Sequence, residues 1–178
     1  MDELLDILDE WGGSTGIPSP RSEVHKLGLW HGTVHVYVCR VVEARLELLV
    51  HLRSPLKDLY PNAWDPVLGG HIQSGRTPQA AVIEELAGEI GLTVSENDLS
   101  TGPVFKADKG LDREFNYLFV SRLPHAAKIR FEDKEVRAIA WMEPELIFEA
   151  IRMSSQKWRP TLAEFSKEYE ALSSLMRS

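Results

Sequence analysis

Two carboxylates four residues apart are the feature of this sequence with the clearest chemical meaning. Glu85 and Glu89 follow a glycine-rich turn in a segment that predicts a helix, so both side chains fall on one helix surface. Like charges at this spacing repel each other, and Glu89 also lies in the last turn, where the helix dipole disfavours an anion. A bound cation offsets both costs. Mg²⁺ fits best, because it takes oxygen ligands and commonly joins one or two carboxylates to substrate phosphates.

The residues around this pair resemble the Nudix box, Gly-x5-Glu-x7-Arg-Glu-U-x-Glu-Glu-x-Gly-U, in which U is an aliphatic residue. The match, laid on the second glycine of the turn, covers Gly70, Glu85, Leu86, Glu89, Gly91 and Leu92. The sequence departs from the motif at three positions. Arg76 replaces the first glutamate of the motif, Glu84 replaces its arginine, and Gly88 replaces a glutamate within the helix.

The first two departures are reciprocal. In the family these two positions form a salt bridge between loop and helix, so we expect an Arg76–Glu84 bridge with exchanged polarity. Gly88 instead removes one carboxylate of the family's metal-binding trio and places a glycine inside a helix, which costs roughly 0.5–1 kcal/mol relative to alanine. If this loss limits turnover, Gly88→Glu is expected to strengthen Mg²⁺ binding and to raise hydrolysis.

The helix that carries the pair has clear boundaries in the sequence. Thr77 can cap its start, Pro78 suits the first helical position, and Gly91 can end it in the left-handed conformation. We expect its buried stripe to consist of Val82, Ile83, Leu86 and Ile90.

The other elements follow from periodicity. Alternation over residues 33–40 predicts a strand with Val34, Val36 and Val38 on one face and His35, Tyr37 and Cys39 on the other. Further strands are expected at 45–52, 101–107, 114–122 and 135–142, a loop at 55–64, and closing helices at 144–153 and 160–177. Residues 2–11 fit either a short helix or one strand of a hairpin, because a glycine-rich stretch follows at once. Mixed strands with helices on both sides predict a three-layer α/β/α sandwich with a mixed central sheet, which is also the fold of the Nudix family.

Length and composition are those of one globular domain. We expect a single Nudix domain over residues 1–178, with an N-terminal hairpin and loop at 1–32, the Nudix-box loop and helix at 69–92, and C-terminal helices at 143–178. The net charge of −7 argues against a nucleic acid polymer or an anionic membrane as partner. The single cysteine excludes an internal disulfide, and no segment is typical of a signal peptide or membrane span, so we expect a cytoplasmic protein. A homodimer is possible.

Residues outside the box narrow the resemblance to one branch. Three short segments, 21–25, 29–31 and 34–36, and the longer segment 52–65 resemble the Nudix branch related to isopentenyl diphosphate isomerase. In the isomerases, the residues at the positions of Arg53 and Lys57 bind the substrate diphosphate. The arginine offers a planar fork of donors and the lysine a flexible point charge, so both suit this role. The alternative is that both are solvated loop charges.

The same resemblance implies a second metal site. His25, His31 and His71 fall near the metal-binding histidines of the isomerases, and Asp112 and Glu114 fall near their two metal-binding carboxylates. Imidazole nitrogens with carboxylate oxygens suit Mn²⁺ or Zn²⁺. Alternatively, the histidines form hydrogen bonds with loops, and the side chains of Asp112 and Glu114 face water. Gly28 separates the first two histidines, so we predict no regular element that fixes their geometry.

Isomerase chemistry itself meets an obstacle. The reaction needs a protonating cysteine directly before the Gly-His pair, where this sequence has Gly69, and the only thiol, Cys39, lies in another strand. We therefore predict Mg²⁺-dependent (or Mn²⁺-dependent) hydrolysis of a diphosphate bond in a nucleoside diphosphate derivative or a similar organic diphosphate. Glu85 and Glu89 hold the metal in this prediction, and Glu114 is the candidate general base. The alternative from another class is a degenerate module that binds a nucleotide or diphosphate without hydrolysing it.

Overall fold

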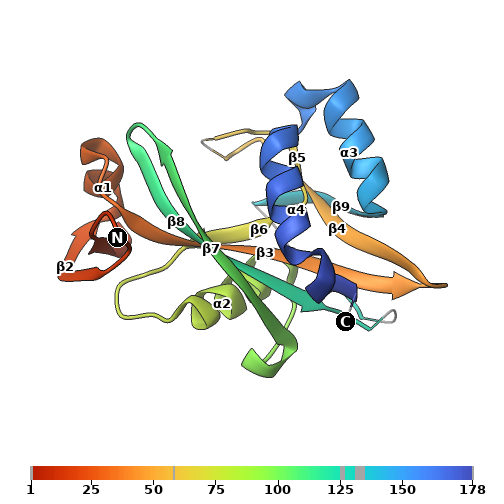
Figure 1. Cartoon of the computed structure of the whole chain (residues 1–178), viewed down its shortest axis with the longest axis horizontal. Helices are drawn as coiled ribbons and strands as arrows, with labels where there is room; N and C mark the ends of the chain where they lie inside the picture. The colour runs from red at the N-terminus through yellow and green to blue at the C-terminus, as the bar shows by residue number, and fades with distance from the viewer. Residues whose placement is uncertain (1, 58, 125–126, 131–134, 178) are drawn as a thin grey trace.

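The computed structural model describes residues 2–57, 59–124, 127–130 and 135–177, so Asp58 in the predicted loop lies outside the described residues. Within these ranges a mixed seven-stranded sheet forms the centre of the molecule (Figure 1). Its strands are β3 (His31–Val42), β4 (Arg45–Arg53), β5 (Trp64–Asp65), β6 (Leu68–His71), β7 (Leu99–Lys109), β8 (Asp112–Arg122) and β9 (Val136–Met142). A separate hairpin, four α-helices and two short 3-10 helices complete the described fold: β1 (Leu4–Leu8), β2 (Ser14–Pro20), α1 (Arg21–Leu27), α2 (Pro78–Ile90), η1 (Glu96–Asp98), α3 (Pro144–Met153), η2 (Ser155–Lys157) and α4 (Leu162–Arg177).

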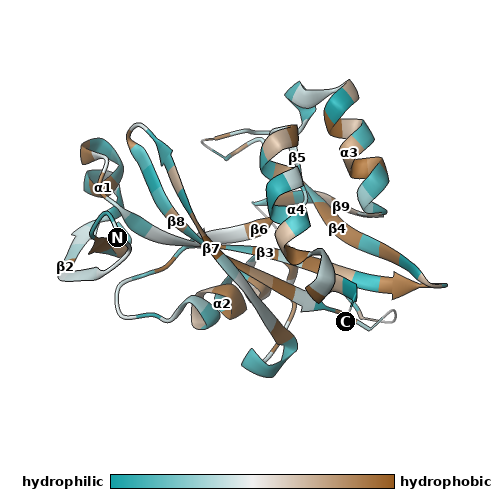
Figure 2. Ribbon diagram, in the orientation of Figure 1, coloured by the Kyte–Doolittle hydropathy of each residue, from teal (hydrophilic) through white to brown (hydrophobic). Residues whose placement is uncertain are grey.

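The layers confirm the predicted α/β/α sandwich with a mixed sheet. On one face, Val34, Val36 and Val38 pack against buried residues of α2. On the other face, Tyr37 and Cys39 pack against α3 and α4, as the predicted alternation requires. Figure 2 shows the apolar residues concentrated along the central strands between these layers. None of the helices in the described ranges combines the length and the apolar character needed to cross a membrane.

The central strands diverge, which creates the space for a site. Residues 39–42 of β3 pair with β4, whereas residues 33–36 pair with β6. Beyond its pairing with β3, strand β4 instead pairs with the two residues of β5, at His51 and Leu52. The segment 64–71 therefore lies in the opening between β3 and β4.

The N-terminal segment settles one alternative and corrects one prediction. Residues 4–8 and 14–20 pair as an antiparallel hairpin, so the helical alternative is wrong. The prediction of a loop up to residue 32 is also wrong in part, because α1 occupies residues 21–27. This helix ends at Gly28, whose φ of 62° is left-handed, and Leu29 N donates to Val24 O at 3.0 Å. A regular element and its cap thus fix His25 relative to His31, contrary to expectation.

Helix α2 confirms the predicted boundaries. Thr77 Oγ1 accepts a hydrogen bond from Ala80 N at 3.2 Å, and Gly91 ends the helix with φ 62°. The predicted buried stripe needs a correction: Ile83 is only half-buried, and Ala81 is buried instead. Glu89 also belongs to the buried set and is only 5% exposed. A carboxylate thus takes a position that the periodicity of an amphipathic helix reserves for an apolar side chain.

Candidate functional site

The two predicted metal ligands lie on successive turns of α2, and the first of them packs against β6. Glu85 packs so closely on this strand that a Cβ at Gly70 would lie 2.1 Å from Glu85 Oε1. Gly70 therefore has a steric function, because any side chain at this position would displace the carboxylate. Glu89 lies one turn further along α2.

Burial and mutual repulsion act on both carboxyls. Burial, together with repulsion from neighbouring carboxylates, raises the pKa of Glu85 to about 7 and that of Glu89 to about 8, although the Lys57 ammonium lowers both. Glu89 Oε2 is buried and has no hydrogen-bond partner among the described residues. An unpartnered buried carboxylate oxygen is costly. A divalent cation fits this donor set, because it would satisfy that oxygen and neutralise the pair.

The two predicted phosphate-binding cations lie at the end of β4 but face different partners. Lys57 Nζ lies 3.8 Å from Glu89 Oε1 and also contacts the carboxylate of Glu135. Arg53 instead donates to Leu59 O at 3.0 Å, and its Nη1 lies 3.7 Å from Asp65 Oδ2. Lys57 therefore adjoins the metal-ligand pair directly, whereas Arg53 belongs to the opening between β3 and β4.

Three groups at or near the site escaped the sequence-based prediction. Asp65 is 1% exposed and contacts both Arg53 and Arg159, a residue just before α4. Glu135 directly precedes β9. The sequence shows Asp65 shortly before the glycine-rich turn, and Glu135 much later in the chain. No sequence pattern linked either residue to the Nudix box.

The exchanged salt bridge is present as predicted. Arg76 Nη2 lies 3.1 Å from Glu84 Oε1, and both side chains are about half exposed (54% and 47%). The bridge ties the glycine-rich loop to the outer face of α2.

Reversing the charges of this bridge one at a time is expected to destabilise the protein slightly. An exposed ion pair contributes roughly 0–1 kcal/mol, so Arg76→Glu or Glu84→Arg should lower the melting temperature by at most about 2–4 °C. The doubly reversed variant should recover most of the loss, because direct coupling is not additive. Thermal denaturation of the four proteins at low salt measures this cycle, and a double variant as unstable as the sum of its singles would contradict it.

The predicted histidines come together at one end of the sheet. His25 of α1, His31 at the start of β3 and His71 at the end of β6 have ring centroids 5.1–5.3 Å apart. His25 Nε2 and His71 Nε2 are separated by 3.1 Å. One ligand nitrogen from each ring lies within 4.8 Å of the others, which is the spacing of a possible metal site.

These histidines are held in the form that binds metal. His31 Nδ1 donates to Leu29 O at 3.0 Å, since a carbonyl only accepts, and this leaves the lone pair on Nε2. That Nε2 is buried without a hydrogen-bond partner in the described ranges. Burial lowers the pKa of all three histidines; for His71, burial and repulsion from Arg21 and from the neighbouring imidazoles, should these become protonated, lower it to about 3. Neutral imidazole is the ligand form.

The carboxylates predicted for a second metal join this cluster rather than the first pair. Ligand atoms of His31, Asp112 and Glu114 lie within 4.8 Å of one another, and burial and the charge of Asp112 raise the pKa of Glu114. Glu114 is the register partner of His31, whereas Gly70 is the partner of Val34. Because side chains alternate along β3, Glu114 lies on the α4 face and Glu85 on the α2 face.

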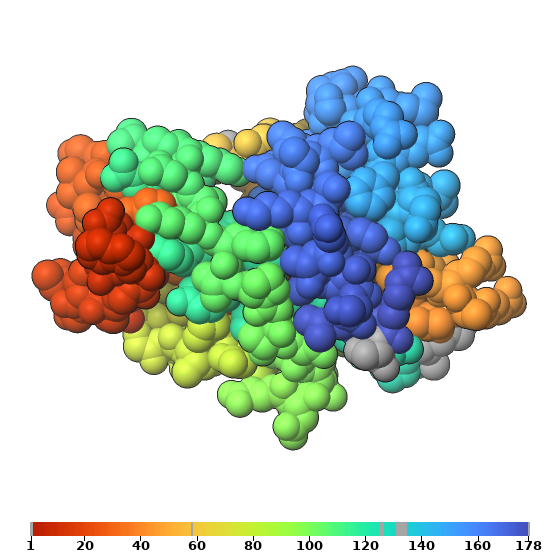
Figure 3. Space-filling model, viewed as in Figure 1, coloured from red at the N-terminus to blue at the C-terminus, as the bar shows by residue number. Residues whose placement is uncertain are grey.

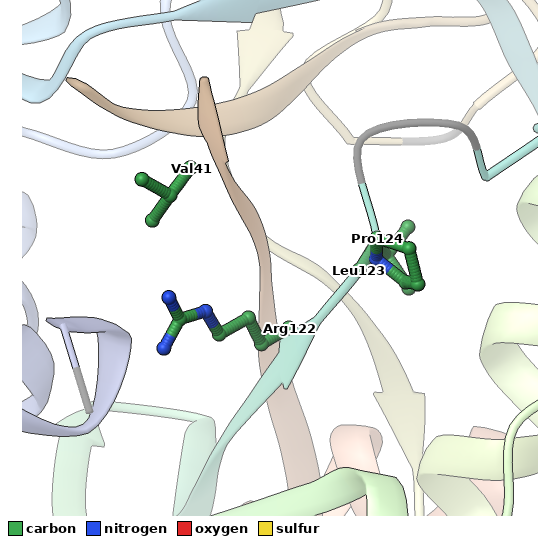
Figure 4. A pocket seen from close by; sticks show the side chains of 4 residues that line it. All are labelled: Val41, Arg122, Leu123 and Pro124. Atoms are coloured by element: carbon green, nitrogen blue, oxygen red, sulfur yellow. The ribbon is translucent and has the colours of Figure 1, made fainter. Parts of the chain in front are cut away.

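The surface has one opening near the histidine cluster and two hollows that lie away from the histidine cluster and from the Glu85–Glu89 pair. Figure 3 shows an opening between the β7–β8 hairpin and α4, elements that are joined by an ion pair between Lys109 Nζ and Glu164 Oε1 at 2.5 Å. A hollow of about 370 Å³ at the far ends of β3 and β8 is lined by Val41, Arg122, Leu123 and Pro124 (Figure 4). Another, of about 490 Å³, lies between β9 and α3 and is mainly apolar. Neither of the latter two has an acidic residue among its lining residues, so neither matches the donor set for a divalent cation.

Comparison with known proteins decides the family. The NUDIX domain profile matches residues 31–166, which include both central strands, the loop and helix of the site, and the first turn of α4. The chain belongs to the NUDIX domain family. Among solved structures, the DR0079 protein of Deinococcus radiodurans superposes with a TM-score of 0.74 over 94% of this Nudix chain and 99% of its own, at 22% identity.

Curated relatives include hydrolases and isomerases. The Nudix chain is 37% identical over 123 residues to a Nudix hydrolase of Clostridium acetobutylicum and 31% identical over 153 residues to Nudix hydrolase 3 of Arabidopsis thaliana. These matches cover 67% and 81% of this chain, but only 59% and 20% of the relatives' own lengths. Isopentenyl-diphosphate Delta-isomerase of Corynebacterium diphtheriae is 27% identical over 178 residues, covering 96% of this chain and 94% of its own.

The geometry at Gly69 bears on the isomerase relatives. A Cβ at this position would lie 1.9 Å from Val34 O, so the paired strands leave no space for a cysteine side chain. Cys39 is fully buried, and burial raises the pKa of its thiol to about 11. Neither position therefore presents a thiol that can protonate a substrate.

Proposed function

We propose that this Nudix protein hydrolyses a diphosphate bond in a nucleoside diphosphate derivative or a similar organic diphosphate, with Mg²⁺ or Mn²⁺ as cofactor. The observation that carries the proposal is the pair of half-buried Glu85 and buried Glu89, with one carboxylate oxygen of Glu89 unpartnered among the described residues. Family membership supports hydrolase chemistry, and the donor set supports a hard divalent cation.

Each residue of the site then has a defined task. Glu85 and Glu89 would hold the cation, which supplies charge neutralisation and a lowered pKa for a bound water. Lys57, directly beside Glu89, would orient the substrate phosphates as a mobile point charge, together with Arg53, which lies near Asp65. Glu114, the predicted general base, lies on the face of the sheet opposite Glu85, so we assign it no part in this step.

The histidine cluster supports a second metal. We propose that His25, His31 and His71, with Asp112, hold a transition metal such as Mn²⁺ or Zn²⁺. Glu114, whose carboxylate lies within 4.8 Å of the ligand atoms of His31 and Asp112, would be a further ligand of this metal. Zinc or manganese analysis of His31→Ala against the wild-type protein tests this assignment, since the wild type should retain metal after dialysis and the variant should lose most of it.

The second candidate function is a module that binds its ligand without turnover, and Gly88 is the observation that favours it. We expect Mg²⁺ to raise the melting temperature by several degrees, because a ligand that binds only the folded state stabilises it. Phosphate release and thermal shift should be scored together over a panel of nucleoside diphosphate derivatives. Release that a chelator abolishes supports the hydrolase; a thermal shift without release supports the binder.

A further inference from the structure

The Nudix box of this chain lacks one carboxylate, yet a carboxylate from outside the box shares an ammonium partner with Glu89. Gly88 occupies an exposed position on α2 and contributes no ligand. Glu135 comes from the residue before β9, far along the chain from α2. Its carboxylate contacts the same Lys57 ammonium nitrogen that lies 3.8 Å from Glu89 Oε1.

The backbone fixes Glu135 at this place. Ser54 N donates to Glu135 O at 2.8 Å, and the next residue, Val136, is the register partner of Arg53. Lys57 N in turn donates to Ser54 O at 3.3 Å, in the turn that follows β4. The end of β4 and the start of β9 thus hold the lysine and the third carboxylate together beside α2.

A single ammonium shared by two carboxylates marks a position suited to a cation. Glu89 is 5% exposed, and its second oxygen has no hydrogen-bond partner among the described residues. Lys57 reaches only the other oxygen, at a distance too long for a hydrogen bond. The lysine therefore neutralises the carboxylates only in part, whereas a divalent ion could coordinate both.

We propose that Glu135 supplies the third carboxylate of the cation site, in place of the one missing at Gly88, and that the cation displaces Lys57 from the carboxylates. This inference rests on the proposed function, because it assumes a cation at Glu85 and Glu89. Once displaced, the Lys57 ammonium can turn to the substrate phosphates. The exchange couples cation binding to the positioning of the diphosphate.

The first test is direct Mg²⁺ binding to the intact chain, measured by calorimetry and by thermal shift without substrate. Glu135→Gln is expected to weaken Mg²⁺ binding at least about tenfold, the scale of effect seen when groups around a metal are lost. The Glu135 side chain is 49% exposed, so its replacement leaves the core intact. Glu149→Gln, the same chemical change on an exposed residue of α3, controls for net charge and should leave Mg²⁺ affinity unchanged.

The second test moves the carboxylate back into the box. A Cβ at Gly88 meets no atom of the described residues within 4 Å, so Gly88→Glu fits without displacement. Gly88→Glu should restore most of the affinity lost in Glu135→Gln, and should strengthen binding less in the wild-type background. Gly88→Gln in the Glu135→Gln background controls for helix propensity and should restore none.

The third test examines the lysine. Lys57→Met removes the competing ammonium, so it should tighten Mg²⁺ binding about threefold or more while it lowers substrate affinity. Mg²⁺ affinity that falls in Lys57→Met would overturn the displacement.

The outcomes separate this inference from the proposed function. If Glu85→Gln loses Mg²⁺ binding and Glu135→Gln keeps it, the third-ligand assignment is wrong and the proposed function stands. If neither variant changes Mg²⁺ binding, both are wrong. Failure of Gly88→Glu to rescue Glu135→Gln would also overturn the claim that one carboxylate replaces the other.

Discussion

Replacement of Glu85 by glutamine is expected to lower phosphate release at least about tenfold, as the loss of one charged ligand to a cation that contributes several kcal/mol of transition-state stabilisation. The change is nearly isosteric, so the contact with β6 can persist. In the metal-free protein the same change removes a half-buried carboxyl whose pKa is raised to about 7 by burial and by neighbouring carboxylates. Stability without Mg²⁺ should therefore be equal or higher, while stabilisation by Mg²⁺ is lost.

A second variant displaces the Glu85 carboxylate without changing its charge. Gly70→Ala leaves every charge in place, but its Cβ would meet Glu85 Oε1 at 2.1 Å and must push the carboxylate away. We expect a comparable loss of activity and of the Mg²⁺-dependent rise in melting temperature. Glu149→Gln on α3 is the matched control for the first variant. Unchanged turnover in Glu85→Gln would exclude this carboxylate as a ligand.

The largest effect on stability is expected at Gly69. A Cβ there would lie 1.9 Å from the backbone oxygen of Val34, so the pairing of β6 with β3 has to shift. Gly69→Cys should destabilise the fold by roughly 2–4 kcal/mol, the range of strongly overpacked core substitutions. It should also fail to confer isomerisation of isopentenyl diphosphate, although it recreates the cysteine before the Gly-His pair.

Gly88→Ala is the comparison, because it adds a Cβ to a glycine with open space around it. No atom of the described residues lies within 4 Å of that added Cβ, and the residue is in the interior of a helix. This variant should be more stable by roughly 0.5–1 kcal/mol. Urea unfolding of both variants measures the contrast. A Gly69→Cys protein as stable as the wild type would show that β6 can move, and an isomerase assay on it would then be decisive.

The local features of this protein were predictable from its sequence. Thr77, Pro78 and Gly91 set the ends of α2, because caps and left-handed glycines act within one turn of the helix. The alternation of β3 followed from the two-residue period of a strand. The Arg76–Glu84 bridge was also predictable, since reciprocal departures from a motif keep a pair of opposite charges.

Only the tertiary structure showed how distant residues meet. Glu135 reaches Lys57 because β9 pairs with β4, and no pattern near residue 135 reports that register. The histidine cluster likewise depends on α1, which the sequence did not predict, and on the pairing of β6 with β3. Periodicity and caps are properties of neighbouring residues. The burial of Glu89, the closed backbone at Gly69 and the position of the third carboxylate arise from packing between elements far apart in the chain, which local sequence does not encode.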